Sequence, residues 1–326
     1  MIGITYIKEV FFLLETFSAT ISAMLVMFLC IAIGFLLRKL RLAPENTASV
    51  LSKLELYVFL PAQILVTFLN YCTVETLRVQ YRVVLYGALA VGIEIVIGLL
   101  AARFFSKEKT ERNIYLYNMI IANMGFLGNA IVPQIMGQEA LYSYLLFCLP
   151  FNIVLYTWAI NLLIPPEKLE KKSIWKKLAH PTLIAMAIGI LLGLSGVGKV
   201  LPGFVGTTLK NLSGCMGPVA MLLTGFVIGG YQIRSLLGNG KVYIITFLRL
   251  LILPCATVGV LTLLGADKIT ALLGMFAAGA ALGLNTVVVP AAYDGDTRPG
   301  AAMAMISHIG AVISIPLLYA LFTQIL

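Results

Sequence analysis

Residues 123–133 read NMGFLGNAIVP, and residues 281–290 read ALGLNTVVVP. Each stretch lies inside a long apolar segment, yet each combines glycine and asparagine with a closing proline. Proline removes a backbone donor and glycine loosens a helix, so neither stretch favours an unbroken helix. The closing prolines, Pro133 and Pro290, are 157 residues apart. The two stretches therefore predict one broken apolar helix in each half of the chain.

Other features recur at almost the same interval. Pro61 and Pro218 lie in apolar runs and are also 157 residues apart, and AIGFLL at Ala32–Leu37 returns as AIGILL at Ala187–Leu192, 155 residues later. We interpret the chain as one unit used twice. In membrane proteins, paired repeats with broken helices are typical of secondary transporters, whose binding site lies between the repeats.

The composition indicates an integral membrane protein. The 326 residues are 60% hydrophobic and 11% charged, with a mean hydropathy of +0.98, whereas soluble domains carry about 25% charged residues. A membrane span needs about 20 mostly apolar residues. We predict an all-α protein with ten transmembrane helices, at residues 16–37, 47–70, 82–105, 114–136, 140–164, 181–198, 204–230, 241–264, 269–292 and 300–325.

The longest polar segment divides these spans into two sets of five. It covers residues 165–180 and reads PPEKLEKKSIWKKLAH. We therefore predict a first repeat at 1–164, a basic linker at 165–180 and a second repeat at 181–326. Because five is an odd number, the second repeat enters the membrane in the opposite orientation, and the repeats are inverted.

Basic residues set the expected orientation. The side that holds the linker carries 16 Lys and Arg residues and the other side carries six. Since cytoplasmic loops are enriched in Lys and Arg, we expect a cytoplasmic linker and both termini outside. The net charge of +9 is spread over these loops, so the expected surroundings are a lipid bilayer rather than nucleic acid. The five cysteines form no CxxC pair, and we expect no cofactor and no metal.

Asparagine in hydrocarbon is costly unless its amide finds partners. We therefore expect Asn123, Asn129, Asn285 and Thr286 to line a substrate cavity, with Gln63 facing it from the second span. Ordinary kinks are the alternative, because proline and glycine are common in membrane helices. The residues expected to shape the two breaks are Gly125, Gly128, Pro133, Gly283 and Pro290.

Three ionisable residues form a candidate intramembrane charge network. Glu94, Arg249 and His308 are each eight to ten residues from a basic cytoplasmic position, which is roughly 12–15 Å of helix. Buried charges in a membrane tend to pair, so we hypothesise a Glu94–Arg249 contact between the repeats. The alternative is that each faces water separately. His308 is either a proton relay or a packing residue.

Four stretches resemble the auxin efflux carrier (AEC) family, in its bacterial type. They are GFLLRKLRLAPENTASVLSKLELYVFLPAQIL at 34–65, NMGFLGNAIVPQIMG at 123–137, ALGLNTVVVPAAYDGD at 281–296 and SHIGAVISIPLLYAL at 307–321. The resemblance implies two inverted five-helix repeats, with broken, crossing helices four and nine. This fold is similar to that of bile-acid symporters and sodium–proton antiporters. In the family, the prolines of spans four and nine would fall near Ala130 and Leu282, whereas Pro133 and Pro290 lie later in their segments. The alternative is that the breaks form at 128–129 and 283–285 instead.

The resemblance also implies elevator-type alternating access, a homodimer, and an organic anion such as auxin or another carboxylate as substrate. We expect a non-enzymatic, secondary active or potential-driven exporter in the cell (inner) membrane. One alternative is a sodium-coupled symporter of the same fold. Another is a membrane enzyme that modifies lipids, which would need an acidic cluster beyond Asp294 and Asp296. The coupling ion, H⁺ or Na⁺, and the substrate stay open.

Overall fold

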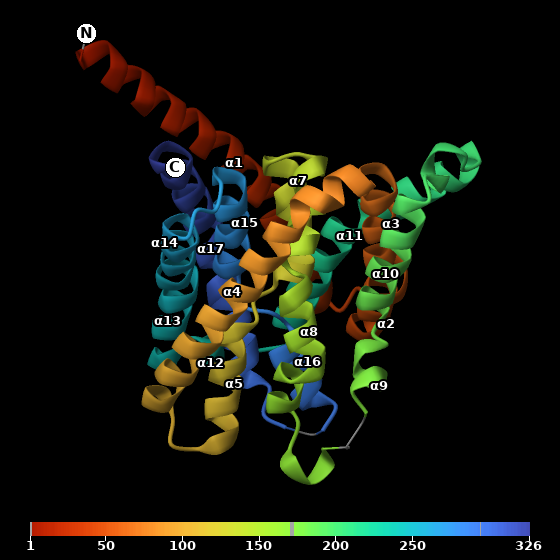
Figure 1. Ribbon diagram of the computed structural model, residues 1–326. Helices are drawn as coiled ribbons and strands as arrows, with labels where there is room; N and C mark the ends of the chain where they lie inside the picture. The colour runs from red at the N-terminus through yellow and green to blue at the C-terminus, as the bar shows by residue number, and fades with distance from the viewer. Residues whose placement is uncertain (1, 170–172, 294) are drawn as a thin grey trace.

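A computed structural model describes residues 2–169, 173–293 and 295–326, with side chains from residue 13 onward. The described residues form helices and no β-strand, as predicted, and the long helices stand side by side (Figure 1). Both chain ends lie at one end of the bundle, and α9 lies toward the other. In chain order the α-helices are α1 (Ile2–Lys39), α2 (Thr47–Leu54), α3 (Leu60–Tyr71), α4 (Val74–Phe105), α5 (Lys109–Ile120), α6 (Asn129–Ile135), α7 (Gln138–Phe147), α8 (Leu149–Thr157), α9 (Ile174–Leu178), α10 (Pro181–Leu194), α11 (Gly203–Gly229), α12 (Ile233–Leu236), α13 (Gly240–Phe247), α14 (Leu253–Leu263), α15 (Lys268–Gly279), α16 (Asn285–Ala291) and α17 (Arg298–Ile325).

Short turns of other helix types connect or interrupt these helices. Three are π-helical: η1 (Glu55–Phe59), η2 (Met124–Gly128) and η6 (Leu248–Ile252). Three are 3₁₀-helical: η3 (Ala159–Leu163), η4 (Pro166–Lys168) and η5 (Val197–Lys199). The turns η1 and η6 join α2 to α3 and α13 to α14 without a gap, so each set forms one continuous rod.

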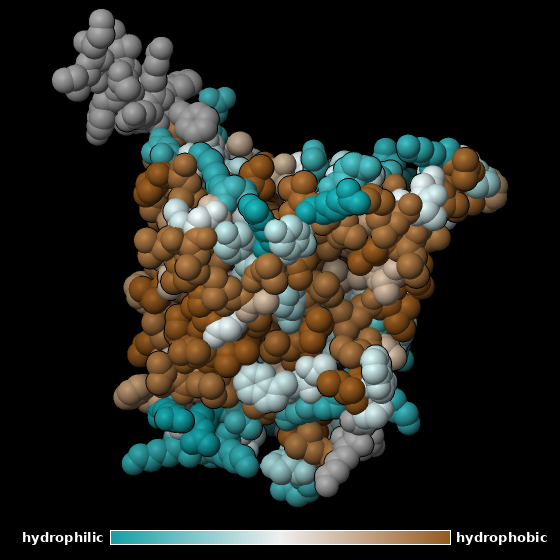
Figure 2. Space-filling view, in the orientation of Figure 1, coloured by the Kyte–Doolittle hydropathy of each residue, from teal (hydrophilic) through white to brown (hydrophobic). Residues whose placement is uncertain are grey.

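The molecule is a multi-pass membrane protein. A brown apolar band covers its middle, and hydrophilic residues gather at both ends (Figure 2). Among the described residues, six helical rods are long and apolar enough to cross a bilayer, or seven if α7 and α8, bent by 43°, count as one. The helices α10 and α15 are apolar but shorter. Ten crossings therefore stay a prediction.

The helix predicted at 114–136 and the helix predicted at 269–292 are both interrupted. The first consists of α5, a non-helical segment at 121–123, and then η2 with α6. The second consists of α15, a segment at 280–284, and then α16. The two segments meet, because Asn123 N–H donates to the carbonyl of Ala281 at 2.8 Å and Ala122 pairs with Leu282 in an antiparallel bridge.

The prolines predicted to shape these breaks lie elsewhere, inside α6 and α16. Pro133 has no N–H for the carbonyl four residues earlier, that of Asn129. The side-chain amide of Gln63 donates to this carbonyl instead, at 3.1 Å. Because α3 supplies the missing donor, the chain stays helical at Pro133 and breaks earlier.

Of the glycines predicted at the breaks, Gly283 lies in the second one. Gly125 and Gly128 lie within η2 rather than in the non-helical segment before it. A Cβ on Gly128 would lie 2.0 Å from the hydroxyl oxygen of Tyr144, so the glycine is needed for close packing of α7. Position 128 is therefore constrained by a side-chain contact and not by the break.

Glycine also sets how closely the long helices pack. Cβ atoms built on Gly34 of α1 and Gly225 of α11 would lie 2.0 Å from the Leu222 carbonyl oxygen and 1.8 Å from that of Ile31. The helices α1 and α11 pack together, as do α3 and α10. Small residues allow membrane helices such close backbone contact.

We predict that Gly225→Ala separates α1 from α11 and lowers the free energy of unfolding by about 1–3 kcal/mol, as overpacking does. Thermal unfolding in detergent measures the effect. Gly206→Ala is the matched control, because it lies on the same helix and its added Cβ meets nothing within 4 Å. Equal melting temperatures for the two variants would contradict the packing argument.

Candidate functional site

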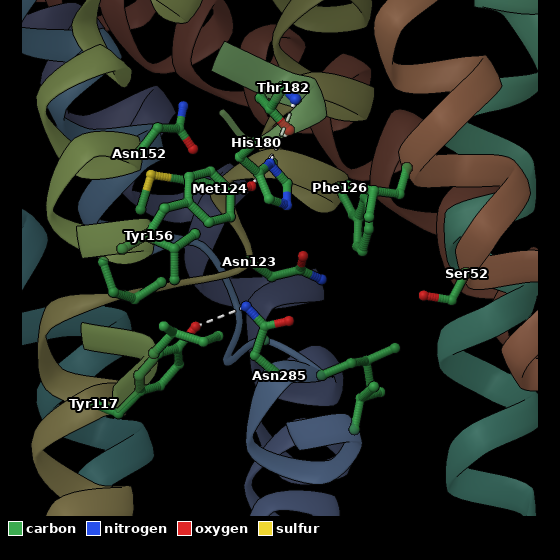
Figure 3. Close-up of a pocket in the computed structure, with 18 of the residues that line it drawn as sticks. Ser52, Tyr117, Asn123, Met124, Phe126, Asn152, Tyr156, His180, Thr182 and Asn285 are labelled. Atoms are coloured by element: carbon green, nitrogen blue, oxygen red, sulfur yellow. Dashed lines mark hydrogen bonds between the residues drawn. The ribbon is translucent and has the colours of Figure 1, made fainter. Parts of the chain in front are cut away.

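A cavity of about 450 Å³ lies between the two helix breaks. Residues from both breaks line it, together with α2, α8, α10, α11 and the linker (Figure 3). Much of the lining is apolar, with side chains such as Leu56, Phe126 and Leu155. The polar lining residues are Ser52, Tyr117, Asn123, Asn129, Asn152, Tyr156, Asn161, Lys168, Lys176, Lys177, His180, Thr182, Asn285 and Tyr293.

Asn285 begins α16 and Tyr117 lies on α5, so this pair joins the two halves of the chain across the cavity wall. The Asn285 side-chain nitrogen donates to the Tyr117 hydroxyl at 2.7 Å (Figure 3). Because that bond uses a lone pair of the phenol, the Tyr117 O–H is left as a donor. The second N–H of the Asn285 amide is a further donor at the same wall.

Asn123 lies in the first break, and its side chain contacts His308 of α17. Asn123 Nδ2 is 3.3 Å from His308 Nε2, and His308 Nδ1 is 2.7 Å from the Ala304 carbonyl oxygen. A carbonyl accepts only, so Nδ1 carries the proton and Nε2 accepts from the asparagine. His308 thus orients Asn123 and does not line the cavity.

The structure brings some of the predicted site residues to the cavity and leaves others out. Asn123, Asn129 and Asn285 line it, as do Gly125 and Gly283. Gln63 and Thr286 do not, because Gln63 bonds the Asn129 carbonyl and the Thr286 hydroxyl bonds the Gly283 carbonyl at 3.0 Å. Both side chains satisfy backbone groups near the breaks.

Sequence reasoning missed the basic end of the cavity. Lys168, Lys176 and Lys177 of the linker segment line it, and no acidic residue is among the described residues that do. The linker lysines entered the sequence argument only as markers of orientation. Asn152, two residues after Pro150, was also missed, although a proline and an asparagine close together in an apolar run could have indicated it.

His180 fixes the start of α10 beside the cavity. Its Nδ1 accepts from the Thr182 N–H at 3.4 Å, and its ring stacks on Tyr156 with centroids 3.5 Å apart. Burial lowers the pKa of His180 to about 4, so the ring is neutral at pH 7. Only the neutral ring has a free lone pair on Nδ1 for this cap.

A buried ion pair lies next to the ends of α5 and α15, where the two breaks begin. Arg249 Nη1 is 2.6 Å from Glu94 Oε2, and both side chains are fully buried. The same guanidinium donates to the carbonyls of Met119 at 2.8 Å and Ala277 at 3.3 Å. These carbonyls belong to the last turns of α5 and α15, the helices that stop at the breaks. His308 does not belong to this cluster; its ring contacts Asn123 and Ala304.

The described residues contain no group of three or more His, Cys, Asp or Glu side chains that could hold a metal ion. The chemistry at the cavity is that of hydrogen-bond donors and positive charge.

We predict that Arg249→Met destabilises the protein by about 3–5 kcal/mol, as removing one partner of a buried pair does. Glu94→Leu combined with Arg249→Met should recover only part of this loss, since the carbonyls of Met119 and Ala277 stay unpaired. Thermal unfolding measures both variants. Arg298→Met, which breaks an exposed pair with Asp296, is the control and should cost at most about 1 kcal/mol.

We also predict a pH-dependent contribution from His180. Its pKa is about 4 in the folded chain and 6.5 in the ordinary state, so the unfolded chain binds the proton more tightly. Stability from this group is complete above pH 6.5 and falls as the pH drops toward 4. His180→Asn keeps a capping side chain and should lose less stability than wild type between pH 7.5 and 5. An identical loss in both proteins would refute the assignment.

Comparison with known sequences places the chain in a family. The family described as "Membrane transport protein" matches two stretches, residues 19–173 and 165–319, which together cover most of the chain. A search of curated proteins found no match. The two matched stretches meet inside the predicted linker. The chain therefore belongs to the auxin efflux carrier family of membrane transport proteins.

Proposed function

We propose that this membrane transporter exports a small organic anion, a carboxylate with an apolar body, across the cell (inner) membrane of a bacterium. The observation that carries the proposal is the cavity between the breaks, with amide and phenol donors at one wall and lysines at one end. Its volume of about 450 Å³ falls in the range of roughly 300–1,000 Å³ typical of small-molecule sites.

The carboxylate is held at the wall formed by Tyr117 and Asn285, where the phenol O–H and the second amide N–H are donors. Asn123 and Asn129 contribute from the other break. The helical bonds of η2 begin with Leu127 N–H, which donates to the Asn123 carbonyl. The N–H groups of the first turn, before Leu127, therefore have no partner within the helix and add donors. Lys168, Lys176 and Lys177 attract the anion from the linker side, which the charge count predicts to be cytoplasmic.

The repeat architecture is part of the proposal. Helical segments occupy each of the ten predicted span ranges, and the two breaks bond to each other. The first rod of each half packs on the second rod of the other, α1 on α11 and α10 on α3, as inverted repeats would. In this arrangement α5–α6 and α15–α16 cross as broken helices four and nine. They carry the anion past the scaffold by an elevator-type movement, within a homodimer.

A sodium-coupled symporter of the same fold is the rival function. It would need several oxygen ligands around one cation. The cavity offers amides and phenols, yet its charged lining residues are basic. The positive charge of these residues favours binding of an anion and disfavours binding of a metal cation beside it.

The test is uptake of labelled indole-3-acetate and malate by proteoliposomes, with and without a membrane potential, a pH gradient and sodium. We expect saturable uptake of one carboxylate. Asn285→Ala removes a hydrogen bond to a charged group, which is worth about 1.5–3 kcal/mol, so KM should rise about tenfold or more.

The matched control is Asn211→Ala, at an exposed asparagine on α11 away from the cavity lining. It should leave KM unchanged. Uptake that does not saturate would indicate a channel, and uptake of neither carboxylate under any gradient would overturn the proposed substrate class. Equal KM values for Asn285→Ala and wild type would remove Asn285 from the site.

A further inference from the structure

Glu55 is the buried acidic side chain that the site described above does not use. Two acidic side chains are buried among those described, Glu55 and Glu94, and each is 0% exposed. Glu94 bonds to Arg249, whereas both carboxyl oxygens of Glu55 lack a hydrogen-bond partner among the described residues. Glu55 lies near the polar start of the predicted second span, two residues after Lys53.

No cationic side chain among the described residues bonds to Glu55. It lies in the π-helical turn η1, which packs against α2, α3, α10 and α11. The ionisable groups on those helices are Lys53 on α2, Tyr71 on α3, and Lys210 and Cys215 on α11, with none on α10. None of them bonds to Glu55. An isolated carboxylate in such a place is very costly, so the group is stable there as the neutral acid.

Glu55 is nevertheless close to the cavity along its own rod. Ser52, one turn before it, and Leu56, the next residue, both line the cavity, and Leu223 of α11 lines it from across the gap. Figure 3 shows Ser52 pointing into this space. Proton release from Glu55 requires a movement of η1 against α11 that opens the carboxyl to water. π-Helical turns are frequent at functional positions because they interrupt the regular ladder.

We propose that Glu55 is the proton-binding site that couples transport to protons. The inference rests on the proposed function, and it names the coupling ion that was left open. The neutral acid holds H⁺ while η1 is buried, and it releases H⁺ when η1 meets water. An anion in the cavity disfavours the charged carboxylate, so anion and proton bind together, and this linkage is reciprocal. The two therefore move in the same direction: an anion accumulated inside leaves together with H⁺, and an acidic outer solution drives the reverse, net uptake.

A proton suits this site better than a metal cation does. A hard cation needs several oxygen ligands, and Glu55 belongs to no acidic cluster among the described residues. A proton needs only one carboxyl oxygen.

Two assays on the same proteoliposomes separate this inference from the proposed function. The first is exchange of labelled for unlabelled indole-3-acetate or malate at equal pH on both sides. The second is net uptake driven by an acidic outer solution, after subtraction of uptake by protein-free liposomes. We expect Glu55→Gln, which mimics the neutral acid, to keep exchange and to lose the acid-driven uptake. Glu139→Gln, at an exposed glutamate, should keep both.

The outcomes are distinct. If wild type exchanges neither anion, the proposed substrate class fails. If wild type exchanges an anion but ignores the pH gradient, or if Glu55→Gln responds to it as wild type does, proton coupling at Glu55 is overturned. Net uptake driven by sodium instead of acid, and lost in Glu55→Gln, would replace the proton with sodium.

A measurement on the unaltered protein guards against misfolding of the variant. Dicyclohexylcarbodiimide enters membranes and reacts with protonated carboxyl groups. Peptide mass spectrometry should find Glu55 labelled and Glu94, held as an ion pair by Arg249, unlabelled. Labelling of Glu94 with Glu55 untouched would overturn the inference.

Discussion

The broken helices depend on one guanidinium group. In hydrocarbon, the last carbonyls of a helix have no water to bond, and α5 and α15 both end there. Arg249 donates to a carbonyl of each, and its positive charge is attracted to the partial negative charge at the C-terminal ends of both helices. Glu94 neutralises the arginine. Because the two helix ends are fixed to the same group, the non-helical segments beyond them start from defined positions and meet. The cavity is the space left around that meeting point.

The sequence identified the helices that break and Gly283 of the second break, but its prolines did not mark where the breaks lie. Glycine, asparagine and proline in an apolar run mark weak points in a helix, and their recurrence pointed to both. Pro133 and Pro290 nevertheless lie inside helices. At Pro133, the carbonyl of Asn129 that the proline leaves unpaired finds another donor. Gln63 provides that donor from 66 residues away, and no local pattern contains such a contact.

The same limit explains what was found and missed at the cavity. Asn123, Asn129 and Asn285 could be predicted because an amide in hydrocarbon needs a partner or a cavity. Thr286 was included for the same reason, yet a threonine hydroxyl can bond a nearby backbone carbonyl of its own segment, and here it does. Lys168 and Lys177 could not be predicted, since lysines in a polar linker are usually solvated. Tertiary folding brings these two to the cavity.

The contact between the two non-helical segments bears on how the protein is made. Asn123 N–H and the Met119 carbonyl are synthesised early, but their partners Ala281 and Arg249 come from the second half of the chain. While only the first half of the chain has been synthesised, α5 ends in the bilayer with the Met119 carbonyl and the Asn123 N–H unpaired. Biogenesis therefore includes an incomplete stage that the later residues terminate. A chain truncated before Arg249 and Ala281 retains these unpaired backbone groups, which makes it a substrate for membrane proteases that degrade incomplete proteins.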